Sequence, residues 1–491
     1  MTTAQMPAPK GSTMTTARID SEAQTLVVAG SGARPASAVL IGARARVGAK
    51  LTGGGKTWKA TFPLRVARWG GAELPLPAGE YSIEIAGVDL EGLRVEPVLM
   101  PTLRLEVTDA VATVAPPLDP VYETAEGQRT LEQRYASQIG AGENAVFFES
   151  FYGQTSGCNP RAIDRVLAER APSVTRYWAV ADLSVEIPDG AIAVVEGSPD
   201  WWRARAESRM LIVNDWLRRR FVRKPGQHVL QTWHGTPLKR LALHRPGFDP
   251  RRMAAVVKES RRWDALLAQN TYAARVLKKA YAFFGRPIWT DGYPRNDLLV
   301  AGDPAPIREE LGIGPDERVL LYAPTWRDDR SEMVDFVDPE ELAARTDSVV
   351  LVRGHSRTLR PGRDRAGSRV IDVTGYPETA RLLLISDALI TDYSSVMFDF
   401  SVTGRPMYFL VPDLEHYRGE LRGFYFDLAQ RAPGPLVRTQ DELIDAVNDD
   451  EGPAAYAEHY AAWTAQFNRL DDGAAADRVV SRILDLGWLT A

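Results

Sequence analysis

The sequence has 491 residues, a formal net charge of −5 and one cysteine, Cys158. This length exceeds what one hydrophobic core organises, so we expect two or three domains. The slightly negative charge argues against nucleic acid as the main partner, and a single cysteine excludes an intrachain disulfide and a cysteine-ligated metal site, which favours a cytoplasmic protein.

The N-terminal stretch MTTAQMPAPKGSTMTTARID contains no apolar segment of the kind found in signal peptides. Its repeat of MTTA, at Met1 and Met14, leaves two candidate translation starts. No uninterrupted apolar run in the sequence reaches the roughly 18 residues that cross a bilayer. We therefore expect a protein that would meet a membrane only at its surface.

Residues 16–112 have the pattern of an all-β accessory domain. Short runs such as TLVVAG, TWKATF and GEYSIEI alternate apolar and polar residues between glycine and proline clusters. This spacing predicts a small antiparallel, immunoglobulin-like sandwich, in which we find no catalytic constellation. Residues 113–139 are expected to form a linker, in which the prolines of VAPPLDP at 114–120 hold the chain extended.

Beyond the linker, buried strands alternate with amphipathic helical segments. This texture predicts an α/β fold with two doubly wound parallel sheets, the first within residues 140–290 and the second within residues 291–475, followed by a C-terminal helix at 476–491. Ligands of such sheets bind beyond the C-terminal ends of the strands. The loops after HVLQTW, LLYAPT, VVLVRG and ALITD are therefore expected to form one site.

The first of these loops, HGTP, places His234 just past a strand end. Gly235 permits a tight turn and Pro237 can open a helix. An imidazole at this edge can serve as a general base near neutral pH. The alternative is a structural histidine that packs beside Trp233.

The loop TDYSS follows the buried strand ALI and begins a helix at Ser394 and Ser395. Hydroxyl groups and free backbone N–H groups at a helix start can bind a diphosphate. Simple N-capping by Asp392 or Ser394 is the alternative. A third strand end carries Arg353 and His355, which could clamp a phosphoryl group or belong to a surface salt bridge.

Several motifs resemble one family when they are taken together. FFESFYGQTSGCNPRAI, QTWHGTPLKRL, DGYPRNDLL, YAPTWRDD, LVRGH, ITDYSSVMFDF and PDLEHYRGELRGFYFDL occur in this order across about residues 140 to 475. The series resembles the CDP-glycerol glycerophosphotransferases, the primases and polymerases of teichoic acid. The resemblance implies a GT-B fold, in which two Rossmann-like domains face a cleft.

The resemblance also implies roles for individual residues. His234 would take the proton from the acceptor hydroxyl, and His355 would lie by the donor pyrophosphate. Ser394 and Ser395 would hold the donor phosphates, which Lys239 also faces, and Asp413 or Glu420 would contact the ribose. The implied substrate-binding residues are Arg353, Ser394, Ser395, Asp392, Thr391, Lys239, Arg327, Asp413 and Glu420.

The implied reaction transfers glycerol phosphate from CDP-glycerol to an acceptor hydroxyl and releases CMP. No carboxylate cluster has the spacing of Mg²⁺ ligands, so we expect no metal or cofactor bound by the protein, although Mg²⁺ can accompany the diphosphate. Three alternatives stay open: CDP-ribitol as donor, a nucleotide-sugar glycosyltransferase of GT-B fold, and a non-catalytic protein that binds a glycan or polymer.

Residues 200–262 are rich in lysine and arginine, in contrast to the whole chain. A solvated basic face is one interpretation. The other is a surface for an anionic, lipid-linked polymer acceptor or for the inner face of the cytoplasmic membrane. Trp201, Trp202 and Trp216 lie among these charges and could contact the bilayer interface or pack in a core.

Overall fold

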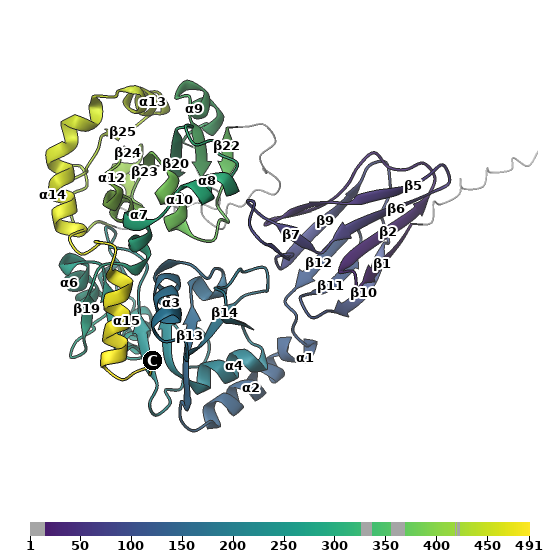
Figure 1. Cartoon of the computed structure of the whole chain (residues 1–491), viewed down its shortest axis with the longest axis horizontal. Coiled ribbons are helices and arrows are strands. Elements are labelled where there is room, and N and C mark those ends of the chain that lie inside the picture. Colours follow the sequence, from purple (N-terminus) through teal and green to yellow (C-terminus); the bar gives the residue numbers. More distant parts are fainter. Residues whose placement is uncertain (1–14, 326–335, 355–368, 418, 420–422) are drawn as a thin grey trace, which may run out of the picture. The chain divides into compact units, whose positions relative to one another are not determined.

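The computed structural model describes residues 15–325, 336–354, 369–417, 419 and 423–491. The chain forms two compact units, one built essentially from the first 119 residues and the other from Pro120 onward (Figure 1). None of the helices in these described ranges is long and apolar enough to cross a membrane.

The first unit is all-β, as predicted, and its two main sheets are antiparallel. One sheet has the order β1-β2-β6-β5, with bounds Thr16–Asp20, Thr25–Ser31, Thr57–Pro63 and Lys50–Gly54. The other has the order β10-β11-β12-β9-β3-β4, with bounds Arg94–Leu99, Arg104–Thr108, Val111–Ala115, Gly79–Ile85, Ala38–Gly42 and Arg46–Gly48. A small hairpin adds β7 (Arg65–Ala67) and β8 (Glu73–Pro75).

Period-two alternation produces the core of this unit. Trp58 and Phe62 point inward from β6, and Tyr81 and Ile83 point inward from β9, so that both sheets contribute to one apolar cluster. The immunoglobulin-like class of this domain stays a prediction.

The segment predicted as a linker, residues 113–139, is largely helical. Strand β12 ends at Ala115, and helices α1 (Pro120–Glu123) and α2 (Ala125–Ser137) follow. The Thr124 hydroxyl caps α2 by accepting a hydrogen bond from the Gly127 N–H (3.0 Å). Helix α2 buries Leu131 and Tyr135, which share an apolar cluster with Phe147 and Leu211, so this helix is part of the core of the second unit.

The second unit begins with a seven-stranded sheet in which every strand pair is parallel. Its order is β15-β14-β13-β16-β17-β18-β19, with bounds Ile192–Val195, Thr175–Val180, Glu143–Glu149, Ser208–Val213, His228–Gln231, Ala265–Ala268 and Ile288–Thr290. Helices α4 (Pro199–Glu207), α5 (Pro250–Ser260) and α6 (Thr271–Ala280) join α2 on one face, and α3 (Cys158–Arg170) covers the other. Trp201 and Trp202 of α4 are core residues, so they are not part of a membrane-facing surface.

A six-stranded parallel sheet follows, in the order β22-β21-β20-β23-β24-β25. The strands are Val370–Asp372, Val349–Val352, Val319–Ala323, Ala388–Thr391, Met407–Leu410 and Leu436–Val437. Its helices are α7 (Asp297–Ala301), α8 (Ala305–Glu310), α9 (Pro339–Arg345), α10 (Thr379–Ile385), α11 (Val396–Phe400), α12 (Leu414–His416), α13 (Gln440–Asn448) and α14 (Ala457–Phe467). The α/β prediction with parallel sheets is therefore confirmed. In both sheets the strand order reverses beside the first strand, at β13/β16 and at β20/β23, where such folds bind ligands.

The last helix, α15 (Ala475–Asp485), returns to the first parallel sheet and lies beside α3 (Figure 1). Its residues Val479 and Ile483 share an apolar cluster with Val146 and Phe148 of β13. The carboxylate of Asp297 accepts hydrogen bonds from the first two N–H groups of α15 (2.9 and 2.8 Å). The core of the first sheet is thus completed by the end of the chain.

Candidate functional site

His234 lies where strand β17 has ended, next to the switch point of the first sheet. Trp233 adopts a φ of 53°, a left-handed conformation that is unusual for a bulky residue. The Asn159 side-chain amide holds this turn by donating to the carbonyl oxygens of Thr232 (3.3 Å) and Trp233 (3.2 Å). The turn changes the direction of the chain and so sets the direction of the imidazole.

The surroundings of His234 define its tautomer. Its Nδ1 lies 2.6 Å from the backbone oxygen of Asn214, and because a carbonyl can only accept, Nδ1 carries the proton and Nε2 the lone pair. The ring stacks on Trp233 with centroids 4.5 Å apart. Burial lowers the pKa of His234, whereas the nearby carboxylate of Asp215 opposes this change. A neutral imidazole with a free Nε2 has the properties of a general base.

Arg295 connects the two parallel-sheet domains behind this histidine. Its guanidinium donates to both carboxylate oxygens of Asp399 in α11 (3.3 and 2.7 Å) and to the carbonyl oxygen of His234 (3.1 Å). The backbone N–H of Arg295 also donates to Asn159 Oδ1 (3.2 Å). Sequence reasoning used the surrounding GYPRND only as part of a family pattern and missed this role. Because the buried guanidinium of Arg295 bonds to both Asp399 and His234, it fixes the His234 loop relative to α11.

The loop 391–395 of the second sheet lies against the His234 loop. A Cβ atom added to Gly235 would stand 2.6 Å from Ser395 Oγ, so the approach of the two loops requires glycine. Ser394 and Ser395 are both half-buried, and Ser395 precedes α11 without capping it through its side chain. The structure therefore brings together the candidate base and both candidate phosphate-binding hydroxyl groups.

The side chains of Thr391 and Asp392 form hydrogen bonds within the protein at the β20/β23 switch point of the second parallel sheet. The Thr391 hydroxyl donates to the carbonyl oxygen of Ala323 (2.7 Å), and the Asp392 carboxylate accepts from the Thr325 N–H at 2.9 and 3.0 Å. These bonds tie the ends of β20 and β23 together. Both side chains are buried, and their hydrogen bonds shape the loop. Direct contact of either residue with the substrate stays a prediction.

Two other predicted site residues, Arg353 and Asp413, form hydrogen bonds within the protein. Arg353 Nη1 donates to the carbonyl oxygens of Val373 (3.0 Å) and Tyr376 (3.1 Å), and burial lowers the pKa of this guanidinium to about 10. Asp413 accepts a hydrogen bond from the Tyr393 hydroxyl (3.0 Å). His355, Arg327 and Glu420 lie outside the described residues.

Lys239 marks a second connection between the two α/β domains. Its backbone forms an antiparallel bridge with Phe424, and its ammonium lies 5.8 Å from the ring centroid of Tyr417. Tyr417 in turn stacks on Tyr393, the residue bonded to Asp413, with centroids 4.3 Å apart. Lys239, Asp413 and the TDYSS loop are therefore close to one another.

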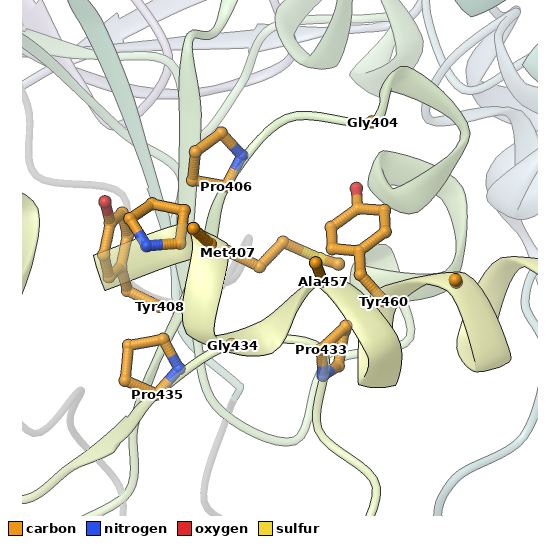
Figure 2. A pocket seen from close by; sticks show the side chains of 12 residues that line it. Gly404, Pro406, Met407, Tyr408, Pro433, Gly434, Pro435, Ala457 and Tyr460 are labelled. Carbon is orange, nitrogen blue, oxygen red and sulfur yellow. The ribbon is translucent and has the colours of Figure 1, made fainter. Parts of the chain in front are cut away.

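Within the described ranges, no group of three or more histidine, cysteine, aspartate or glutamate side chains is placed to hold a metal ion. A pocket of about 440 Å³ lies between the start of β24, the 433–435 loop and α14. Figure 2 shows that proline rings and Tyr408 and Tyr460 surround Met407 there. Because this pocket lies at the N-terminal end of β24, it is not part of the site at the C-terminal strand ends.

A family model described as CDP-Glycerol:Poly(glycerophosphate) glycerophosphotransferase matches residues 134–485. The chain belongs to this family. The family predicted from the sequence motifs is thereby confirmed, and residues 1–119 lie outside the matched range.

Proteins of similar sequence support the assignment to the glycerophosphotransferase family. The teichoic acid poly(glycerol phosphate) polymerase of Bacillus subtilis is 36% identical over 379 residues, which are 71% of this chain and 50% of that protein. The match thus spans about half the length of that polymerase. The teichoic acid glycerol-phosphate transferase of Staphylococcus aureus is 35% identical over 70% of this chain and 93% of its own length.

A solved structure shares the fold of the matched region. It is a variant of the wall teichoic acid polymerase TagF soaked with CDPG, with a TM-score of 0.66 and 28% identity. The likeness covers 74% of this chain and 98% of the TagF chain.

Proposed function

We propose that this glycerophosphotransferase moves glycerol phosphate from CDP-glycerol to a hydroxyl group of an acceptor and releases CMP, in the synthesis of a teichoic-acid-like polymer. One observation carries the proposal: His234, with Nε2 as its basic nitrogen, lies on a loop packed against Ser395. The family match and the CDPG-soaked TagF structure support CDP-glycerol as the donor.

In the proposed reaction, the acceptor oxygen attacks the phosphorus atom that carries the glycerol. The bond from this phosphorus to the CMP oxygen breaks, and His234 Nε2 takes the proton of the acceptor hydroxyl. Ser394 and Ser395 donate hydrogen bonds to the donor phosphates, where negative charge develops. His355 and Arg353 act at the pyrophosphate, and any Mg²⁺ arrives with the diphosphate.

The test is CMP release from CDP-glycerol with a glycerol-phosphate-primed lipid acceptor. We expect acceptor-dependent release by the wild type and at least a hundredfold loss, in order of magnitude, in His234→Ala. His228→Ala is the matched control, because His228 lies at the other end of strand β17 and stacks on Trp488. Turnover with CDP-ribitol or a UDP-sugar alone would refute the donor, and full activity of His234→Ala would refute the base.

We also propose that the protein acts on a lipid-linked anionic acceptor at the inner face of the cytoplasmic membrane. Phe248 and Phe284 are 85% and 62% exposed. They flank α5 and α6, which both pack against the short helix at Ala242–His244. Basic residues of α5 and α6 are Arg251, Arg252, Lys258, Arg275, Lys278 and Lys279. Exposed aromatic rings among basic groups favour binding to anionic lipid.

Vesicle sedimentation tests this surface. We expect binding to vesicles that contain phosphatidylglycerol and little binding to pure phosphatidylcholine. Phe248→Ser/Phe284→Ser should reduce the binding, whereas Leu99→Ser, which removes an exposed apolar residue from the first unit, should not. Equal binding of all three proteins would refute the proposed surface.

We further propose a GT-B arrangement for the two α/β domains and an immunoglobulin-like sandwich for the first unit. The repeated strand order of the two parallel sheets supports the first proposal. Two antiparallel sheets around a common core support the second.

A further inference from the structure

A strained turn follows the first strand of the first parallel sheet. Phe151, Tyr152 and Gly153 have φ values of 45°, 58° and 74°, so three consecutive residues adopt the left-handed conformation and two of them are aromatic. At the two aromatic residues this conformation is strained, and such strain tends to persist where it serves a site. The surrounding contacts show what the turn positions.

The turn brings both of its aromatic side chains into the surroundings of His234. The Phe151 ring lies 5.4 Å from the His234 ring, and the Phe151 N–H donates to Asn214 Oδ1 (2.8 Å). The Tyr152 hydroxyl donates to Asp215 Oδ1 (2.7 Å), the carboxylate that acts on the pKa of His234. Tyr152 is thus fixed beside the general base.

Arg218 lies on this tyrosine. Its guanidinium carbon is 3.4 Å from the centroid of the Tyr152 ring, and the residue is exposed. Among the residues that the structure describes, Arg218 takes part in no ion pair, whereas its neighbour Arg219 pairs with Glu196 (2.9 Å). The nearby acidic groups are Asp215, which is bonded to Tyr152, and Glu149, which is buried and whose pKa burial raises to about 7.

We propose that Arg218 binds a phosphodiester group of the acceptor, next to the hydroxyl that His234 deprotonates. Stacking on Tyr152 restricts the guanidinium while leaving N–H donors at its edge, and a planar guanidinium matches the oxygen atoms of a phosphate. The inference rests on the proposed function for the nature of the acceptor. It adds an acceptor-side phosphate subsite to a site whose other anion-binding groups face the donor.

The first experiment measures binding without turnover. A soluble oligomer of glycerol phosphate, free of lipid, is titrated into the wild type, Arg218→Gln and Arg220→Gln by calorimetry. Arg220→Gln removes the same charge from an exposed neighbour and is the matched control. Losing a charge-assisted contact should weaken binding roughly ten- to a hundredfold in Arg218→Gln and change it less than about twofold in Arg220→Gln.

The second experiment measures turnover, with the same oligomer and with a lipid-linked primer as acceptors. Arg218→Gln should raise the KM of both acceptors and leave the KM of CDP-glycerol unchanged. Tyr152→Phe, which keeps the ring beneath Arg218, should retain oligomer affinity.

The outcomes are distinct. Equal weakening by Arg218→Gln and Arg220→Gln, or no oligomer binding by the wild type, would overturn the subsite. An effect confined to the lipid-linked primer would also overturn it, because the phosphate recognised would then belong to the lipid carrier. If oligomer binding depends on Arg218 but CDP-glycerol gives no turnover, the subsite stands and the proposed donor fails.

Discussion

Replacing Arg295 by methionine tests the connection between the His234 loop and α11. The side chains of Arg295 and Asp399 are only 11% and 6% exposed. Removing one partner of a buried ion pair costs about 3–5 kcal/mol, because the other charge is left unpaired. We therefore expect Arg295→Met to lower the free energy of unfolding by about this amount, measured by urea denaturation and tryptophan fluorescence.

The loss should depend on pH. Burial raises the pKa of Asp399, and Arg295 opposes this rise, so the pKa climbs further when the arginine is absent. A carboxyl group whose pKa is raised by folding contributes stability at low pH that is lost as the pH increases. The cost of Arg295→Met should therefore be smaller at about pH 5 than at about pH 8.

The double variant Arg295→Met/Asp399→Leu is the control for this prediction. It removes both charges and should recover most of the lost stability, because apolar replacement of a whole buried pair is often close to neutral. The reasoning would be refuted if Arg295→Met cost less than about 1 kcal/mol near pH 7, or if the double variant were no more stable than the single one.

Two further predictions concern residues of the site, and a third concerns the buried carboxyl group of Asp471. Gly235→Ala should lower the free energy of unfolding by about 1–3 kcal/mol in urea denaturation, because its Cβ would overlap Ser395 Oγ at 2.6 Å. Adding Ser395→Gly to this variant should restore the lost stability. No loss in Gly235→Ala would contradict the close approach of the two loops. Asp215→Asn should move the acidic limb of the pH profile of CMP release to lower pH, because the Asp215 carboxylate raises the pKa of His234. Movement of this limb to higher pH would show that another group controls it. The Asp471 carboxyl group accepts hydrogen bonds from the Tyr293 N–H (2.9 Å) and the Gln269 side-chain amide (2.7 Å), and burial raises its pKa to about 6. Its contribution of about 3 kcal/mol to stability is therefore complete below about pH 4 and is lost as the pH rises through 6. The unfolding free energy of Asp471→Asn should lack this change with pH, and identical pH profiles of the two proteins would argue against it.

The sequence pattern was sufficient for the parallel strands and for the loops that form the site. Buried runs such as HVLQ and ALIT are strands, and His234 and Ser395 follow them at the same kind of edge. That edge is common to all parallel sheets, so proximity of these side chains could be predicted without coordinates.

The parts that could not be predicted depend on contacts between distant segments. Arg295 and Asp399 are 104 residues apart, and neither local periodicity nor composition indicates that they pair. Asp392 has the position of a ligand-binding residue, yet its carboxylate bonds to the backbone of Thr325, 67 residues away. The helix α2 was missed because prolines dominate the start of its segment, whereas its buried face is made by residues further along.

The position of α15 has a consequence for biosynthesis. Residues Val479 and Ile483 pack on the sheet that begins at Glu143. A nascent chain can therefore form the strands of this sheet early and cover part of one face with α3, but it cannot complete the burial of that face until the C-terminal helix has left the ribosome. Domains generally fold in order during translation, and here the first α/β domain must stay incomplete while the second is being made. The part of this apolar face that α15 covers would be exposed during that interval, which is the period when a chaperone would be most needed.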